Sequence, residues 1–145
     1  RDADDYLLDL GAAAIVDAKE CGKPEGALMR TQWGGAIDNL GGDMLAWLIA
    51  TTHPHGNIGS IGLAASFKLN TTVMPFILRG VNLLGIHSVD IPHSLRLATW
   101  EKIFGEWRLA EPERLVAAEI GLDEVPAACE KLMAAQVRGR YLVKI

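Results

Sequence analysis

Histidine and cysteine are the residue types of this chain that could ligate a metal or act as nucleophiles. His53 and His55 flank one proline, and together they could offer two ring nitrogens to a zinc ion. No cysteine, aspartate or glutamate stands beside them, so the spacing favours a loop with two surface histidines. Cys21 and Cys129 form no C-x-x-C pair, which is typical of thiols in a reducing cytoplasm. We therefore expect no metal site and a cytoplasmic protein.

His87 and His93 are candidates for proton transfer by residue type alone. A lone histidine in an α/β chain is more often structural or exposed. No nucleophilic triad, paired-carboxylate site or zinc cluster can be assembled from the residues present. We therefore predict no catalytic residue within this chain.

Length and composition set the class of protein. The chain has 145 residues, half of them hydrophobic, which is enough for one domain with a sizeable core. Its net charge is −4 and it contains no basic run, which argues against nucleic-acid binding. No apolar run is long enough to span a bilayer, and the first five residues, RDADD, do not resemble a signal peptide. We expect neither nucleic acid nor membrane as a partner.

Hydrophobic periodicity and glycine positions predict alternating helices and strands. The order in the first half is a helix at 2–10, a buried strand at 12–17, a loop or weak helix at 19–33, a strand at 34–40, a helix at 43–51 with Asp43 as its N-cap, and a strand at 56–62. The glycines of this last strand indicate either a cramped central strand or a close approach of the backbone to a flat ligand.

The stretch from Thr71 to Val89, TTVMPFILRGVNLLGIHSV, predicts a short helix or turn before Gly80 and a strand at Val81–Ile86. A long helix at 94–107 follows, with an apolar stripe whose i, i+3, i+4 spacing is typical of a buried face. The stripe comprises Leu97, Trp100, Ile103, Phe104 and Trp107. A strand at 115–120, a helix capped by Asp123 and a strand at 141–145 complete the prediction.

Several phrases of this sequence resemble the medium-chain dehydrogenase/reductase superfamily. The most specific is TTVMPFILR, which resembles the zinc-independent quinone-oxidoreductase and acrylyl-CoA-reductase branch. DYLLDLGAAAIVD, GGAIDNLGGD, the GLA at 62–64 and the closing QVRGRYLVKI resemble other segments of the same proteins. Together these phrases extend over nearly the whole chain.

The resemblance implies an α/β fold: an incomplete Rossmann-type doubly wound parallel sheet plus a short carboxy-terminal segment of the catalytic domain. It places the partial dinucleotide-binding domain at residues 1–108 and the catalytic-domain segment at 109–145. The chain has no G-x-G-x-x-G turn that would hold a pyrophosphate. We therefore expect the carboxy-terminal part of a longer enzyme, inactive by itself.

The resemblance also implies the residues that bind NADPH. They are Asn39, Gly62, Leu63, Ala64, Phe76, Ile77 and Leu78, which we expect to converge at the carboxyl ends of the strands. NADPH rather than NADH is an expectation from the family alone. Arg138 and Arg140 are candidates for substrate binding through a phosphate or a thioester-bound carrier, or else they are solvated charges on a turn.

Two functional hypotheses follow. In the first, the chain is part of an NADPH-dependent oxidoreductase that reduces an activated alkene by hydride transfer. The substrate would be an acrylyl-CoA-like thioester or a quinone or enone. In the second, it is a non-catalytic α/β fragment whose role is self-association. Both allow a homodimer through Val81–Ile86, an edge strand without lysine or proline.

Overall fold

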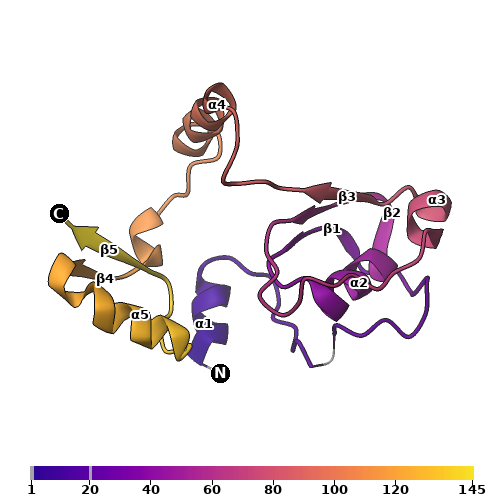
Figure 1. Cartoon of the computed structure of the whole chain (residues 1–145), viewed down its shortest axis with the longest axis horizontal. Coiled ribbons are helices and arrows are strands. Elements are labelled where there is room, and N and C mark those ends of the chain that lie inside the picture. Colours follow the sequence, from indigo (N-terminus) through magenta and orange to yellow (C-terminus); the bar gives the residue numbers. More distant parts are fainter. Residues whose placement is uncertain (1, 20) are drawn as a thin grey trace. The chain divides into compact units, whose positions relative to one another are not determined.

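The computed structural model describes residues 2–19 and 21–145, and these form two compact units (Figure 1). Unit 1 contains the residues up to Ile15 together with His93–Ile145. Unit 2 contains the continuous segment Val16–Pro92. Both units mix helices with parallel strands, which confirms the predicted α/β class.

Unit 2 is built on a sheet of three parallel strands. Its elements are β1 (Trp33–Asp38), α2 (Gly42–Thr51), β2 (Thr52–Ser60), α3 (Met74–Arg79) and β3 (Asn82–Gly85). The strands follow one another in the order β1-β2-β3, so β3 is an edge of the sheet that the described residues form (Figure 1). Each connection between neighbouring strands contains a helix, because a parallel pair cannot be joined by a tight hairpin.

The core of unit 2 lies between α2 and the sheet. Leu45 and Ile49 of α2 meet Ile58 of β2 and Val81, and all four side chains are buried. Phe76 and Leu83 pack against this cluster from outside. The helix therefore fixes the position of β2, whose carboxyl end faces the site described below.

A bulge interrupts the pairing of β1 with β2. Trp33 is opposite Thr52, but two positions later Gly35 is opposite Asn57. The extra residues of β2 include His55, which has a φ of 64°, a left-handed conformation that is uncommon for a residue other than glycine. His53 and His55 are both exposed on this bulge, as the sequence predicted for a surface pair.

Unit 1 contains a second, two-stranded parallel sheet. Its main elements are α1 (Asp2–Asp9), α4 (His93–Phe104), β4 (Val116–Gly121), α5 (Val125–Met133) and β5 (Arg140–Lys144), with short 3₁₀ helices at Pro112–Leu115 and Leu122–Glu124. One face of α5 lines a hollow against β4 and β5; its residues are Val125, Ala128, Cys129 and Leu132.

Four predictions about elements are wrong. Residues 12–17 form no strand, because no other described segment offers them a hydrogen-bonding partner and a strand requires one. Asp43 is not the N-cap of α2, since Gly41 occupies that position; likewise Glu124, and not Asp123, precedes α5. The predicted buried stripe of α4 is exposed, with no buried residue along the helix.

Candidate functional site

The turn after β1 is organised by Asp38, a carboxylate that is only 2% exposed. Its Oδ1 accepts hydrogen bonds from the backbone N–H groups of Leu40 (3.1 Å) and Gly41 (3.0 Å). Ser60, the last residue of β2, donates its hydroxyl to Oδ2 at 3.5 Å. A short acidic side chain that bonds the backbone two or three residues on stabilises a tight turn. Asp38 therefore ties the carboxyl ends of β1 and β2 together.

Asn39 and the segment Gly62–Ala64 lie against each other at this end of the sheet. The N–H of Gly62 donates to the carbonyl oxygen of Asp38 at 3.3 Å, and that of Ala64 to Asn39 at 3.2 Å. A Cβ on Gly62 would lie 2.5 Å from the Asn39 oxygen, so only glycine allows this approach. The structure thus brings together the four site residues that the sequence assigned to the ends of β1 and β2.

A cleft of about 480 Å³ opens beside these residues, at the carboxyl ends of β2 and β3. It is lined by Ser60, Ile61, Gly62, Leu63, Gly85, Ile86 and His87. Its walls are largely apolar and uncovered, since Ile61 is 44% exposed, Leu63 66% and Ile86 47%. Nothing lies within 4 Å of the point where a side chain at Gly85 would begin. The cleft is therefore open to a flat apolar ligand.

Phe76, Ile77 and Leu78 are not part of this cleft. They belong to α3, which leads into the amino end of β3 (Figure 1). Phe76 packs on the core, and Ile77 and Leu78 are exposed by 72% and 61%. The prediction that these three residues converge with Asn39 and Gly62 is wrong, because an element that precedes a parallel strand lies at the amino end of that strand. Their contact with a cofactor stays a prediction that this placement does not support.

Arg79, at the end of α3, joins three segments at that opposite end. Its Nη1 donates to the carbonyl oxygen of Ala50 at 2.8 Å, and its Nη2 to that of Met29 at 2.6 Å. The guanidinium thereby satisfies a carbonyl in the last turn of α2 and fastens the loop before β1. Arg79 has a structural task in this arrangement.

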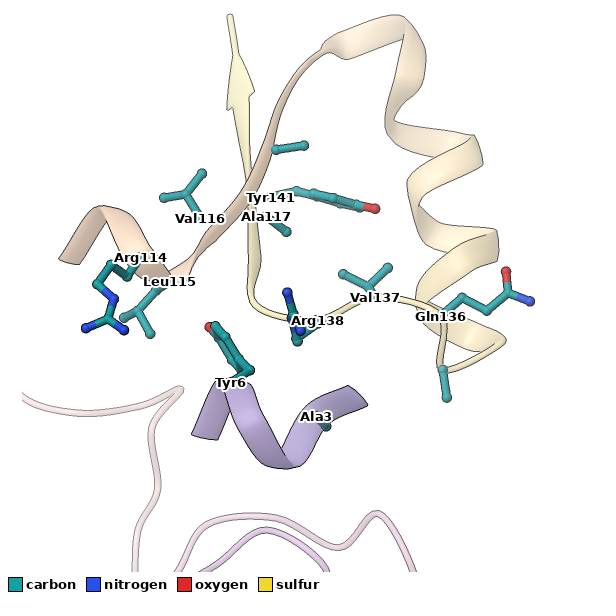
Figure 2. Close-up of a pocket in the computed structure, with 12 residues that line it drawn as sticks. Ala3, Tyr6, Arg114, Leu115, Val116, Ala117, Gln136, Val137, Arg138 and Tyr141 are labelled. Atoms are coloured by element: carbon teal, nitrogen blue, oxygen red, sulfur yellow. The ribbon is translucent and has the colours of Figure 1, made fainter. Parts of the chain in front are cut away.

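The two arginines proposed for substrate binding are separated by the structure. Arg138 lines a second cavity, of about 710 Å³, which lies wholly within unit 1 (Figure 2). Its guanidinium carbon lies 4.8 Å from the centre of the Tyr6 ring, close enough for a cation–π contact. Arg140, the first residue of β5, lines a different hollow, between that strand and α5. Substrate binding by both stays a prediction.

No protein-family model matches the chain. It is 37% identical over 147 residues to the Bacillus subtilis protein YhfP, named as a quinone oxidoreductase; the match covers 100% of the chain and 44% of YhfP. It is 35% identical over 142 residues to the acrylyl-CoA reductase AcuI of Ruegeria pomeroyi, with 97% of the chain and 43% of AcuI covered.

Two solved structures agree with these relatives. The crystal structure of YhfP with NAD bound has a TM-score of 0.94 at 36% identity, over 100% of this chain and 44% of that one. Escherichia coli K-12 YhdH with bound NADPH has a TM-score of 0.91 at 35% identity, over 99% of this chain and 44% of that one. The chain belongs to the medium-chain dehydrogenase/reductase superfamily. It spans less than half the length of the curated relatives it matches.

Further residues of this medium-chain dehydrogenase/reductase chain lie at the site, although the sequence alone did not assign them to it. Asp38, Ser60 and Gly85 were not assigned a role, and His87 was noted only by type. The signal was available, because each of the first three ends a strand of one parallel sheet, where ligands of such sheets bind. Aspartate three residues before Gly41 also predicts the turn.

Neither a metal site nor a membrane-spanning helix is found among the described residues. Among the described residues, no group of three or more histidine, cysteine, aspartate or glutamate side chains could hold a metal ion. The described part of the chain likewise contains no helix long and apolar enough to cross a bilayer. The candidate ligand sites described above are the cleft at β2 and β3 and the cavity at Arg138.

Proposed function

We propose that this chain is part of an oxidoreductase that uses NADPH to reduce an activated alkene. The observation on which the proposal depends is the open apolar cleft at the carboxyl ends of β2 and β3. Ligands of open α/β sheets bind at this edge. Relatives with the same fold are crystallised with NADPH or NAD, and they have names of oxidoreductases.

The residues present fit the nicotinamide end of the cofactor. The open space at Gly85 lets a flat ring approach the strand, where any larger residue would place a side chain. Ile61, Leu63 and Ile86 offer exposed apolar surface that such a ring would cover. Ser60 and His87 supply polar groups on the same wall. A pyrophosphate-binding glycine turn is not among the residues of this chain.

Bound NADPH would supply a hydride, and the residues of this chain would orient the ring that holds it. The apolar wall excludes water from one face of the ring, which leaves the other face for the substrate. Asp38 fixes the loop that bears Asn39. The backbone of Asn39 in turn packs against Gly62 and accepts the hydrogen bond of Ala64. The position of Leu63 in the cleft therefore depends on a carboxylate that does not line it.

The substrate that we propose is an acrylyl-CoA-like thioester or a quinone or enone. Both kinds have a carbonyl conjugated to the alkene, so hydride addition at the β-carbon places negative charge on that oxygen. The names of the relatives point to the same two kinds. The division into a dinucleotide-binding part at 1–108 and a catalytic-domain part at 109–145 belongs to this proposal.

We also propose a homodimer through Val81–Ile86 and a cytoplasmic location. β3 is an edge strand among the described residues, and Leu84 on it is 47% exposed, whereas Leu83 packs on the core. An exposed apolar edge recruits another strand, and a two-fold axis would pair it with its own copy. The cytoplasmic location is proposed from the sequence, since two lone cysteines without a C-x-x-C pair are typical of a reducing compartment.

The test is binding of NADPH to the full-length protein with the substitution Gly85→Val. A valine side chain fills the space beside the strand, so we expect the dissociation constant for NADPH to increase at least tenfold. This corresponds to a loss of roughly 1.4 kcal/mol of binding free energy. Gly34→Val is the matched control, since Gly34 of β1 also has nothing within 4 Å and lies at the amino end. Reduction of acryloyl-CoA and of a quinone is then followed for the unsubstituted protein.

Four outcomes have different consequences. Loss of binding in Gly85→Val but not in Gly34→Val supports the cleft as the nicotinamide site. Equal binding in both variants refutes the placement. A protein that binds NADPH but reduces neither substrate refutes the activity, and one that does not bind it favours the non-catalytic hypothesis.

A further inference from the structure

The histidines of this chain lie in different surroundings. His53 and His55 are exposed on the bulge of β2, and His93 begins α4. His87 follows β3 and lines the cleft at the carboxyl ends of β2 and β3. Residue type alone left His87 and His93 as equal candidates for proton transfer, whereas the cleft distinguishes between them.

His87 is the titratable group of the cleft. The other described residues that line the cleft are apolar residues or glycines, apart from Ser60. The carboxylate of Asp38 accepts the Ser60 hydroxyl at 3.5 Å, but it is only 2% exposed and does not line the cleft. Among the described residues of this wall, His87 is therefore the one that can gain or lose a proton near neutral pH.

The backbone holds His87 at a defined place beside the strands. The N–H of Ile86 donates to the carbonyl oxygen of Ser60 at 2.9 Å, directly after the last paired residues of β2 and β3. His87 is the next residue along the chain. Nothing lies within 4 Å of the point where a side chain at Gly85 would begin, so a flat ligand can lie close by. Because His87 is also exposed, water can return a proton to its ring.

The proposed reduction needs a proton as well as a hydride. Addition of a hydride to the β-carbon breaks the π bond of the alkene and leaves an enolate, with NADP⁺ as the oxidised product. The α-carbon of this enolate then needs one proton to complete the saturated product. A general acid within reach of that carbon accelerates such a step, and histidine is the side chain most often used for it.

We infer that His87 is the proton donor of this reaction and thus a catalytic residue. The inference rests on the proposed function and deepens it by naming the acid. The N–H bond of the His87 imidazolium breaks as the C–H bond at the α-carbon forms, and the neutral imidazole then takes a proton from water. In sum, the alkene, NADPH and one proton become the saturated product and NADP⁺. This role departs from the prediction that the chain contains no catalytic residue.

The first experiment asks whether His87 lies at the bound cofactor, and its result does not depend on turnover. NADP⁺ is titrated into the full-length protein while the imidazole C–H signals of the histidines are followed by NMR. The variants His87→Gln and His93→Gln assign the two signals that matter. We expect NADP⁺ to shift the His87 signal and to leave the His93 signal in place.

The second experiment follows the proton itself. Acryloyl-CoA and methyl vinyl ketone are reduced in heavy water, so that the α-carbon receives deuterium. A donor fixed on one side of the substrate gives one enantiomer at that carbon, whereas water gives both. His87→Gln should therefore produce both enantiomers and lower kcat about a hundredfold, while the affinity for NADPH stays the same. The matched control His93→Gln should change neither rate nor product.

Chemical rescue separates a proton donor from a structural residue. In His87→Ala, added imidazole should restore part of the lost rate, because the ring can then reach the substrate from solution. A residue that only supports the fold would not be replaced in this way.

Several results overturn the inference and leave NADPH-dependent reduction standing. They are a His87 signal that NADP⁺ does not move, an unsubstituted protein that already gives both enantiomers, and a His87→Gln variant with unchanged rate and a single enantiomer. Reduction of a quinone but of neither conjugated alkene has the same consequence, because no α-carbon then takes a proton. An unsubstituted protein that binds NADPH but reduces none of these substrates overturns the proposed reaction and the role of His87 together.

Discussion

Asp38→Ala is the substitution that tests most directly how the site is held together. The carboxylate is 2% exposed and accepts hydrogen bonds from the N–H groups of Leu40 and Gly41. The Gly41 N–H also lies 3.1 Å from the second carboxylate oxygen. Alanine removes every one of these acceptors and leaves two amide donors without a partner.

The magnitude follows from those two donors. An unsatisfied buried hydrogen-bonding group costs about 1–3 kcal/mol, and bonds to a charged acceptor are at the upper end of the usual range. We therefore expect Asp38→Ala to lower the free energy of unfolding of unit 2 by about 2–5 kcal/mol. Asp38→Asn keeps one oxygen in place and should lose about half as much.

The assay needs a local signal, because the protein has two compact units. Amide hydrogen exchange of Leu40 and Gly41 reports the opening of this turn alone. Their exchange should accelerate by at least about a hundredfold in Asp38→Ala, which corresponds to roughly 2.7 kcal/mol. Asp43→Ala is the control, since Asp43 is exposed and makes no capping hydrogen bond. If the two variants protect these amides equally, Asp38 does not organise the turn.

Three further predictions concern the same unit. Arg79→Lys should lower the midpoint of urea unfolding, because one ammonium cannot replace both guanidinium hydrogen bonds; a midpoint like that of the unsubstituted protein would contradict this. Gly62→Ala should reduce NADPH affinity and stability, because its Cβ would lie 2.5 Å from a backbone oxygen, whereas Gly85→Ala meets open space and should be milder. Leu84→Lys should shift light scattering toward a monomer at micromolar concentration, and a compact monomer of the unsubstituted protein at every concentration would refute the β3 dimer.

Local patterns predicted most of the elements. The strands at 34–40 and 56–62, the short helix before Gly80 and the strand at 81–86 all appear within a few residues of the predicted bounds. Glycines lie at or near the ends of these elements and mark where each one stops. These signals are local, so the sequence contains them regardless of what the chain packs against.

Predictions that required a partner were the ones that failed. The apolar run at 12–17 has the composition of a strand, but a strand exists only beside another strand, and no described segment pairs with it. The stripe on α4 has helical spacing, yet Trp100 and Phe104 stack on each other on an exposed face. Periodicity shows which side of an element is apolar and does not show what covers that side.

The site residues were predicted correctly where they follow the carboxyl end of a parallel strand in the sequence. Asn39 and Gly62 follow the carboxyl ends of β1 and β2, and the structure brings them together. Phe76 precedes β3, so the direction of a parallel strand alone would have excluded it from that edge. The separation of Arg138 from Arg140 could not be predicted, because it depends on where the turn ends and β5 begins.

The contact between Tyr6 and Arg138 joins residues near opposite ends of the described chain, whereas unit 2 is one continuous segment between them. On the ribosome, β1 to β3 can pair and cover α2 as soon as the residues up to Pro92 have emerged. Unit 1 has to wait, with α1 already synthesised, until β5 leaves the exit tunnel. During that interval Ala3 and Tyr6 of α1 do not yet have the residues of β4 and β5 beside them. A ribosome stalled late in translation should therefore display a folded unit 2 and a chaperone-accessible α1.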